Sequence, residues 1–245
     1  MTLLQGQVAI VTGASEGIGK AIAQAFAAAG AKTVLAARSL DKIEALVKTI
    51  KQNGGEAIAV RTDVTAEADI VNLFAKTREA YGRLDVLVNN AGKGGGGPTD
   101  ELPLERWQTM IDTNLTSAFL CSREALKIMK PQKSGRIIMI GSIASLTPRP
   151  NGAMYTTTKH GLEGLTHSIC QDYRALHISA SIIRVGSTDT NFTNIPRDQA
   201  VGPEYLMDPA DVANVVVMMA AQKPEVNIYE VTMLPTEQRS FIARG

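Results

Sequence analysis

The chain has 245 residues, 44% of them hydrophobic and 20% charged, which is typical of a globular protein rather than a disordered one. A formal net charge of +1 argues against a nucleic-acid-binding or polybasic membrane-binding surface, and no apolar run is long enough to span a bilayer. With no signal-peptide pattern and two isolated cysteines, Cys121 and Cys170, the sequence predicts a cytoplasmic protein with buried free thiols and no partner among membranes or nucleic acids.

Short apolar runs that alternate with helical patterns predict an α/β fold. The seven predicted strands are residues 7–11, 32–37, 57–61, 84–88, 135–142, 178–185 and 228–234. Strands separated by helices form parallel sheets through right-handed crossovers. No linker composition or repeat divides the chain. We therefore expect a Rossmann-type, doubly wound parallel sheet in a single domain that spans residues 1–245.

A glycine-rich turn follows the first predicted strand directly. It reads Thr12-Gly-Ala-Ser-Glu-Gly-Ile-Gly19, and a run of small apolar residues then predicts a helix as far as about residue 30. Strand, glycine turn, helix and strand within about 30 residues form a dinucleotide-binding unit. Gly13 would permit the tight turn, Gly17 would let backbone amides approach a pyrophosphate, and Gly19 would allow close packing of helix and strand.

The end of the second predicted strand bears on the choice of dinucleotide. Folds that bind NAD usually place an acidic residue there to hold the ribose 2′-hydroxyl, whereas an arginine accommodates the 2′-phosphate of NADP. This chain has Arg38 and Ser39 at that point and no acidic residue before Asp41. The pattern favours NADP (NADPH) over NAD, because a guanidinium can pair with phosphate in two places. The alternative is that Arg38 is a solvated residue at a strand end.

The segment after the fourth predicted strand contains four consecutive glycines, residues 94–97. Such a run is typical either of a backbone that a ligand approaches closely or of a flexible loop, and the sequence does not separate the two. Residues 102–129 then predict one largely helical stretch, which contains Asn114.

Three polar side chains around the fifth strand suggest acid–base chemistry. Ser142 ends this strand, and Tyr155 and Lys159 are four residues apart, a spacing that puts both on one face of a helix. A Lys ammonium about 4 Å away would favour the phenolate by about 4 kcal/mol, enough to lower the pKa of Tyr155 by roughly three units before desolvation is subtracted. A phenol with such a pKa suits proton transfer near neutral pH, and Ser142 would hold a carbonyl oxygen beside it.

The remaining elements carry fewer signals. Residues 191–207 form an irregular polar segment that we interpret as a substrate lid. Asp208 and Pro209 predict the start of a helix, with aspartate as the N-cap and proline at the first helical position. The three histidines show no spacing with other ligand types, so no metal site is expected.

Five features in register along the chain resemble the short-chain dehydrogenase/reductase family. They are the turn at residues 12–19, the Asn-Asn-Ala-Gly segment at residues 89–92, Asn114, Ser142, and the pair Tyr155 and Lys159 in a Tyr-x-x-x-Lys pattern. The resemblance covers most of the chain. It implies an enzyme that moves a hydride between a nicotinamide and a carbonyl or alcohol, with Asn114, Ser142, Tyr155 and Lys159 as its catalytic residues. Asn114 would hold a water that connects Lys159 to solvent.

The resemblance also implies binding residues. The expected cofactor contacts are Gly13, Ser15, Glu16, Gly17, Ile18, Gly19, Arg38, Ser39, Asp63, Val64, Asn90, Ala91, Gly92, Tyr155, Lys159, Val185, Gly186 and Thr188, and the expected substrate contacts are Ser142, Ala144, Tyr155 and Gly186. Asp63 would meet the adenine amino group, although a simple loop cap is the alternative. Thr188 would meet the nicotinamide carboxamide, and Val185 stands where the family usually has proline.

Substrate identity is not readable from these motifs. We expect a small-molecule carbonyl or alcohol and, from the resemblance alone, a homodimer or homotetramer. A 3-oxoacyl thioester on an acyl carrier protein is the alternative substrate. A sensor that binds NADP without turning it over is a further alternative, although such proteins typically lack the tyrosine or the lysine.

Overall fold

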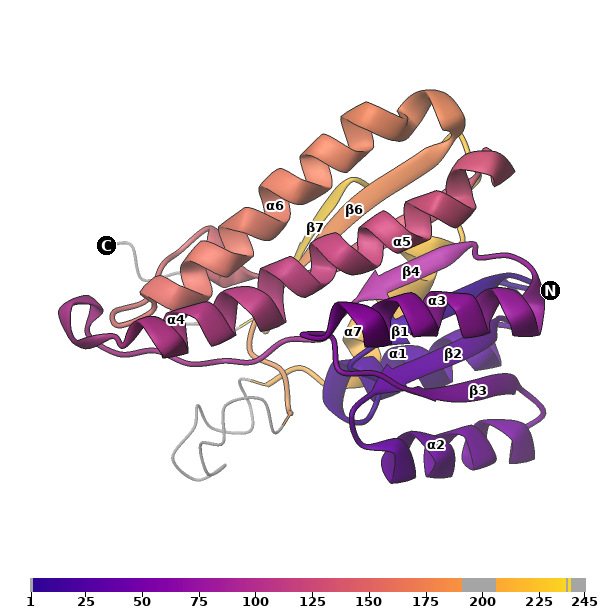
Figure 1. Ribbon diagram of the computed structural model, residues 1–245, viewed down its shortest axis with the longest axis horizontal. Helices are drawn as coiled ribbons and strands as arrows, with labels where there is room; N and C mark the ends of the chain where they lie inside the picture. The colour runs from indigo at the N-terminus through magenta and orange to yellow at the C-terminus, as the bar shows by residue number, and fades with distance from the viewer. Residues whose placement is uncertain (1, 191–205, 237, 239–245) are drawn as a thin grey trace.

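The computed structural model describes residues 2–190, 206–236 and 238. Within them lies a seven-stranded parallel sheet with the order β3-β2-β1-β4-β5-β6-β7 (Figure 1). Its strands are β1 (Val8–Thr12), β2 (Lys32–Ala37), β3 (Glu56–Arg61), β4 (Val86–Asn89), β5 (Gly135–Ser142), β6 (Ile178–Val185) and β7 (Glu230–Met233). The direction of winding reverses between β1 and β4, and ligands of such sheets bind at the carboxyl ends of the strands beside this reversal.

Helices cover both faces of the sheet. They are α1 (Gly17–Ala28), α2 (Leu40–Gln52), α3 (Glu67–Tyr81), α4 (Leu104–Ile111), α5 (Ser117–Gln132), α6 (Ala153–Tyr173) and α7 (Pro209–Ala220). Buried residues of α1, α2 and α7 form one core with the sheet, and those of α3, α5 and α6 form a second core. Strands buried on both faces explain the continuous apolar runs of the sequence. The predicted doubly wound α/β fold is therefore confirmed.

The stretch at residues 102–129 is largely helical, as predicted, although it begins at Leu104. A π-helical turn, Asp112–Thr116, separates α4 from α5 within it. Asn114 lies in this turn, and its side chain bonds with the backbone of Lys93 outside the helix. Single π turns inside helices are frequent at functional sites. The last strand, β7, is also shorter than the predicted residues 228–234.

Other expectations have mixed outcomes. Asp208 caps α7 by accepting the Ala210 amide at 2.8 Å, and Pro209 opens the helix as predicted. Both cysteines are free, but Cys170 is only partly buried, whereas Cys121 is fully buried. The predicted lid falls, apart from its last two residues, outside the described residues. No helix in the described part of the chain is long and apolar enough to cross a membrane.

Candidate active site

The glycine turn after β1 is held by backbone conformation and by one asparagine side chain. Gly13 and Gly17 have φ angles of +65° and +54°, which residues other than glycine rarely adopt. A Cβ atom on Gly19 would overlap the carbonyl oxygen of Gly13. The side-chain amide of Asn90 donates to the carbonyls of Thr12 at 2.9 Å and Gly13 at 3.2 Å. The segment directly after β4 therefore holds the turn that follows β1.

The Thr12 hydroxyl is a second clamp, which the sequence analysis did not single out. It accepts the amides of Asn90 at 3.0 Å and Ala91 at 3.1 Å, and it donates to the carbonyl of Val88 at 3.2 Å. The first turn of α1, beginning at Gly17, contains no acidic residue that would compete for its amides. A glycine-lined turn at a helix N-terminus fits the pyrophosphate of a dinucleotide.

Charged side chains surround the ends of β2 and β3. Arg38 is exposed, and Lys42 of α2 pairs with Glu16 of the glycine turn at 3.2 Å. Asp63 accepts the amide and the hydroxyl of Thr65 at 3.0 and 2.7 Å. These bonds, with the charge of Arg38 as a lesser cause, hold the pKa of Asp63 below its usual range. Asp63 thus caps its own loop, which was the alternative to a contact with adenine, and Arg38 lies close enough to lower the pKa of its carboxyl.

Ser142 and Tyr155 are brought together at the carboxyl end of β5. A side-chain hydrogen bond joins them, and the Ser142 hydroxyl also accepts the Ala144 amide at 3.1 Å. Burial raises the pKa of the Tyr155 phenol above its ordinary value, while the bond with Ser142 and the charge of Arg149 oppose this rise. The expected lowering of the Tyr155 pKa is therefore wrong for this structure, since desolvation outweighs the favourable charges.

Lys159 lies below the same phenol, one turn further along α6. Its Nζ atom is 5.4 Å from the centroid of the Tyr155 ring and donates to the carbonyl of Ile140 at 2.8 Å. The side chain is buried, and burial lowers its pKa to about 8. The Lys159 amine is thus hydrogen-bonded to β5, and its removal from water disfavours the charged form.

Asn114 links the π-helical turn to two other parts of the site. Its side chain accepts the Lys93 amide and donates to the Lys93 carbonyl, both at 2.9 Å. It also donates to the Met110 sulfur at 3.1 Å and to the Thr158 hydroxyl at 3.3 Å. Thr158 in turn donates to the Tyr155 carbonyl at 2.8 Å. Asn114 therefore ties the segment after β4 to α6, and its predicted water remains a prediction.

An ionic network around the buried Arg184, which we did not predict from the sequence, lies behind Ser142. Arg184 of β6 donates to Glu163 of α6 at 2.6 Å and to Glu230 of β7 at 2.8 Å. The Ser145 hydroxyl bonds with Glu163 and with the carbonyl of Ser142. An arginine in the otherwise apolar run of β6 was the available signal, because a charge is rarely buried without a partner. We call Ser145, Glu163, Arg184 and Glu230 the ionic brace.

The segment after β6 is held from β7 and from the C-terminal region. Val185 pairs with Met233 in the sheet, and the Gly186 amide donates to the Met233 carbonyl at 2.7 Å. The Ser187 amide donates to the side-chain carbonyl of Gln238 at 2.8 Å, and Gln238 is buried. Gln238 lies outside every motif, so no local pattern signalled this role.

The remaining predicted contacts lie around these groups. Ser15, Glu16 and Ile18 belong to the glycine turn, and Ser39 is the N-cap residue of α2. Val64 follows Asp63, and Thr188 follows Ser187. Gly92 lies against Asn114, and Ala144 is buried beside Ser142. Apart from Tyr155 and Lys159, the predicted dinucleotide residues thus lie at the carboxyl ends of β1, β2, β3, β4 and β6 or in the segments that follow them. The predicted catalytic residues lie on β5, on α6 and in the π-helical turn.

Comparisons with known proteins identify the family and the fold. The short chain dehydrogenase family model matches residues 7–200. A 3-oxoacyl-[acyl-carrier-protein] reductase of Synechocystis sp. is 42% identical over 194 residues, which are 79% of this chain and 78% of that protein. The dehydrogenase/reductase SDR family member 11 of Gallus gallus is 36% identical over 96% of this chain and 98% of its own.

A solved structure extends the comparison to the fold. The crystal structure of a metagenomic short-chain oxidoreductase in complex with NADP has a TM-score of 0.84 and 37% identity, covering 96% of this chain and 99% of that chain. The chain therefore belongs to the short-chain dehydrogenase/reductase family and is an oxidoreductase that acts on CH–OH or C=O groups.

Proposed function

We propose that the protein uses NADP to interconvert a small-molecule carbonyl compound and its alcohol, with Ser142, Tyr155, Lys159 and Asn114 as the catalytic groups. The observation that carries this proposal is the hydrogen bond between Ser142 and Tyr155, with the Lys159 ammonium beneath the same phenol. Beside them lies a glycine turn shaped for a dinucleotide. When bound there, NADPH supplies the hydride to the carbonyl carbon.

The side chains supply position and a proton. Ser142 would hold the carbonyl oxygen, and Tyr155 would donate its proton to that oxygen as the charge develops. Because burial raises the pKa of Tyr155, the phenol is in its proton-donating form at neutral pH, which suits carbonyl reduction. Lys159, whose pKa is lowered to about 8, still carries its charge at pH 7 and would stabilise the phenolate that remains.

The choice of NADP rests on the exposed Arg38 at the end of β2. It is free to meet a 2′-phosphate, since no hydrogen bond or ion pair of the described residues engages its side chain, and α2 begins directly after Ser39. The amides of that helix N-terminus would add to the attraction for phosphate. The solved relative with NADP is consistent with this choice.

We propose two substrate classes, in order of preference. A small ketone or aldehyde is our first proposal, and a 3-oxoacyl thioester is the second, because a relative of that activity shares 42% identity. The homodimer or homotetramer, the single domain and the lid at residues 191–207 remain predictions.

NADPH oxidation measured against a panel of ketones, aldehydes and a 3-oxoacyl thioester, beside NADH, tests the proposal. We expect turnover with NADPH at a kcat/KM at least tenfold above that with NADH. NADPH binding without turnover across the panel would favour a sensor instead. Equal or faster rates with NADH would remove the role of Arg38.

A further inference from the structure

The four-glycine run forms one wall of a cavity beside the predicted catalytic residues. The Gly97 amide donates to the Asn151 carbonyl at 2.8 Å, and a Cβ atom on Gly96 would overlap that same carbonyl oxygen. Arg106 of α4 donates to the Gly96 carbonyl at 3.0 Å. The run is therefore hydrogen-bonded to neighbouring segments, and the Asn151 carbonyl leaves no room for a side chain at Gly96.

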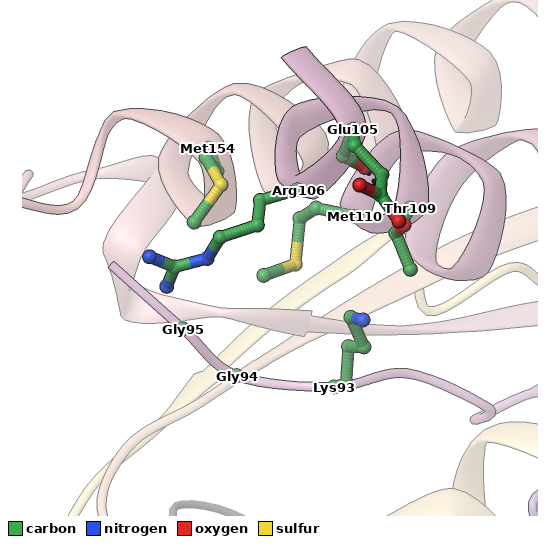
Figure 2. A pocket seen from close by; sticks show the side chains of 8 residues that line it. All are labelled: Lys93, Gly94, Gly95, Glu105, Arg106, Thr109, Met110 and Met154. Atoms are coloured by element: carbon green, nitrogen blue, oxygen red, sulfur yellow. Dashed lines mark hydrogen bonds between the residues drawn. The ribbon is translucent and has the colours of Figure 1, made fainter. Parts of the chain in front are cut away.

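The opposite wall and the floor of this cavity come from α4 and α6. The cavity has a volume of about 250 Å³, and Figure 2 shows Met110 and Met154 facing the segment at residues 93–95. Both methionines are buried. Met110 accepts a hydrogen bond from Asn114, and Met154 directly precedes Tyr155. The apolar floor thus contacts Asn114 and includes the residue next to Tyr155 on α6.

Two cations and one acid line the same cavity. Lys93 and Arg106 are positively charged, and Glu105 is the only acidic residue among those lining it within the described part of the chain. Figure 2 shows the Arg106 side chain extending between Met154 and residues 94–95. Its bond to Gly96 is the one hydrogen bond that the described residues give this guanidinium, so donors remain for a ligand. The net charge of the lining fits a monoanion.

We propose that this cavity binds the far end of the substrate and that this end is a carboxylate on a short apolar chain. The inference rests on the proposed function and names its substrate class: an oxo acid whose carboxylate lies a few methylene groups from the carbonyl. A cavity of about 250 Å³ has room for a short chain of this kind. The methylenes lie on Met110 and Met154, and the carboxylate pairs with Arg106.

The test compares 6-oxoheptanoate with its neutral methyl ester as substrates in the presence of NADPH. We expect kcat/KM for the acid to exceed that for the ester by about tenfold, a preference that 0.5 M salt weakens. Arg106→Gln abolishes the preference by raising KM for the acid more than KM for the ester, and Glu105→Gln enlarges it. Arg78→Gln on α3, which changes an exposed arginine outside the cavity, leaves the preference as it was.

A binding measurement separates this inference from the proposed function. Titration calorimetry with the product-like acid 6-hydroxyheptanoate should show binding to the full chain with NADP and loss of binding in Arg106→Gln. Binding without turnover of any carbonyl would overturn the proposed function and support the subsite. Turnover with equal use of acid and ester, or equal loss of both in Arg106→Gln, would overturn the subsite alone.

Discussion

The glycine turn and the surroundings of Ser142 are held by different kinds of interaction. Around the turn, glycine conformations and hydrogen bonds from the uncharged Asn90 side chain to the backbone set the shape, while the charged pair Lys42–Glu16 is exposed. Around Ser142, charged groups are buried and burial changes their pKa values, as for Lys159. The fold of the first region should therefore tolerate changes of charge but not an added methyl group, whereas the second should be sensitive to changes of charge.

The largest effect is expected where an added atom has no room. Gly19→Ala places its Cβ against the Gly13 carbonyl and the Asn90 amide, so either α1 or the turn must move. We expect NADPH affinity to fall at least a hundredfold and the free energy of unfolding to fall by about 1–3 kcal/mol, as overpacking does. Calorimetric titration and urea unfolding measure the two effects.

Gly164→Ala is the matched control for this substitution. Gly164 lies within α6, and nothing lies within 4 Å of the position that a Cβ would occupy. Replacing a helical glycine by alanine should leave NADPH binding unchanged and stabilise the fold by up to about 1 kcal/mol. Comparable NADPH affinity in the two variants would contradict close packing as the basis of the turn.

A change of charge at the dinucleotide end should alter specificity and leave the fold intact. In Arg38→Gln we expect Kd for NADPH to rise about tenfold, because a charge-assisted phosphate contact is lost, while Kd for NADH stays the same. Lys48→Gln, which changes an exposed lysine more than two turns further along α2, is the control and should change neither constant. A parallel loss of NADPH and NADH affinity in Arg38→Gln would indicate a structural role instead.

A change of charge at the catalytic end should affect both stability and rate. Glu163→Gln keeps the shape of the side chain but leaves the buried Arg184 with only Glu230 as an ionic partner. We expect the free energy of unfolding to fall by about 2 kcal/mol and kcat to fall several-fold, with Kd for NADPH unchanged. Thermal unfolding and steady-state kinetics measure these.

Glu230→Gln separates positioning from stability within the ionic brace. Glu230 bonds with Arg184 but has no bond to Ser145, which contacts Ser142. This variant should lose stability while keeping its kcat. If Glu230→Gln and Glu163→Gln lower kcat equally, the loss of rate does not come from the contact of Glu163 with Ser145.

The smallest expected effect concerns pH. Burial lowers the pKa of Lys159 to about 8 from an unfolded value of 10.5, so the unfolded chain binds more protons at this side chain between those values. Stability should therefore rise with pH through this window, by about 1 kcal/mol between pH 7 and 9. Lys159→Met removes the charge and should remove that increment. An identical pH dependence in both proteins would contradict the burial of the ammonium.

The same contrast between regions explains what the sequence could predict. The turn with Gly13, Gly17 and Gly19 acts through local backbone conformation, and apolar periodicity marks the strands, so both are readable along the chain. The π-helical turn at Asn114 depends on a backbone segment 21 residues away, and the brace between Glu163 and Arg184 depends on the pairing of α6 with β6. Contacts between residues far apart in the sequence leave little trace in the local sequence pattern.

The wrong expectation for Tyr155 has a related cause. Spacing correctly predicted that Tyr155 and Lys159 lie on one face of a helix, and a charge estimate at that spacing gave a lowered pKa. The burial of the phenol, which depends on how α6 packs at the end of β5, reverses the direction. Spacing shows which groups meet, whereas their protonation depends on the solvent that the fold removes.

Carbonyl reduction in the proposed function depends on the Tyr155 phenol as the proton donor. The most direct test of this role is the rate of NADPH oxidation by Tyr155→Phe with the best substrate of the carbonyl panel, measured beside NADPH affinity and thermal unfolding. We predict a fall in kcat of about a thousandfold, with Kd for NADPH and the unfolding temperature close to those of the unaltered protein. A folded Tyr155→Phe variant that keeps more than about a tenth of the rate would contradict the account.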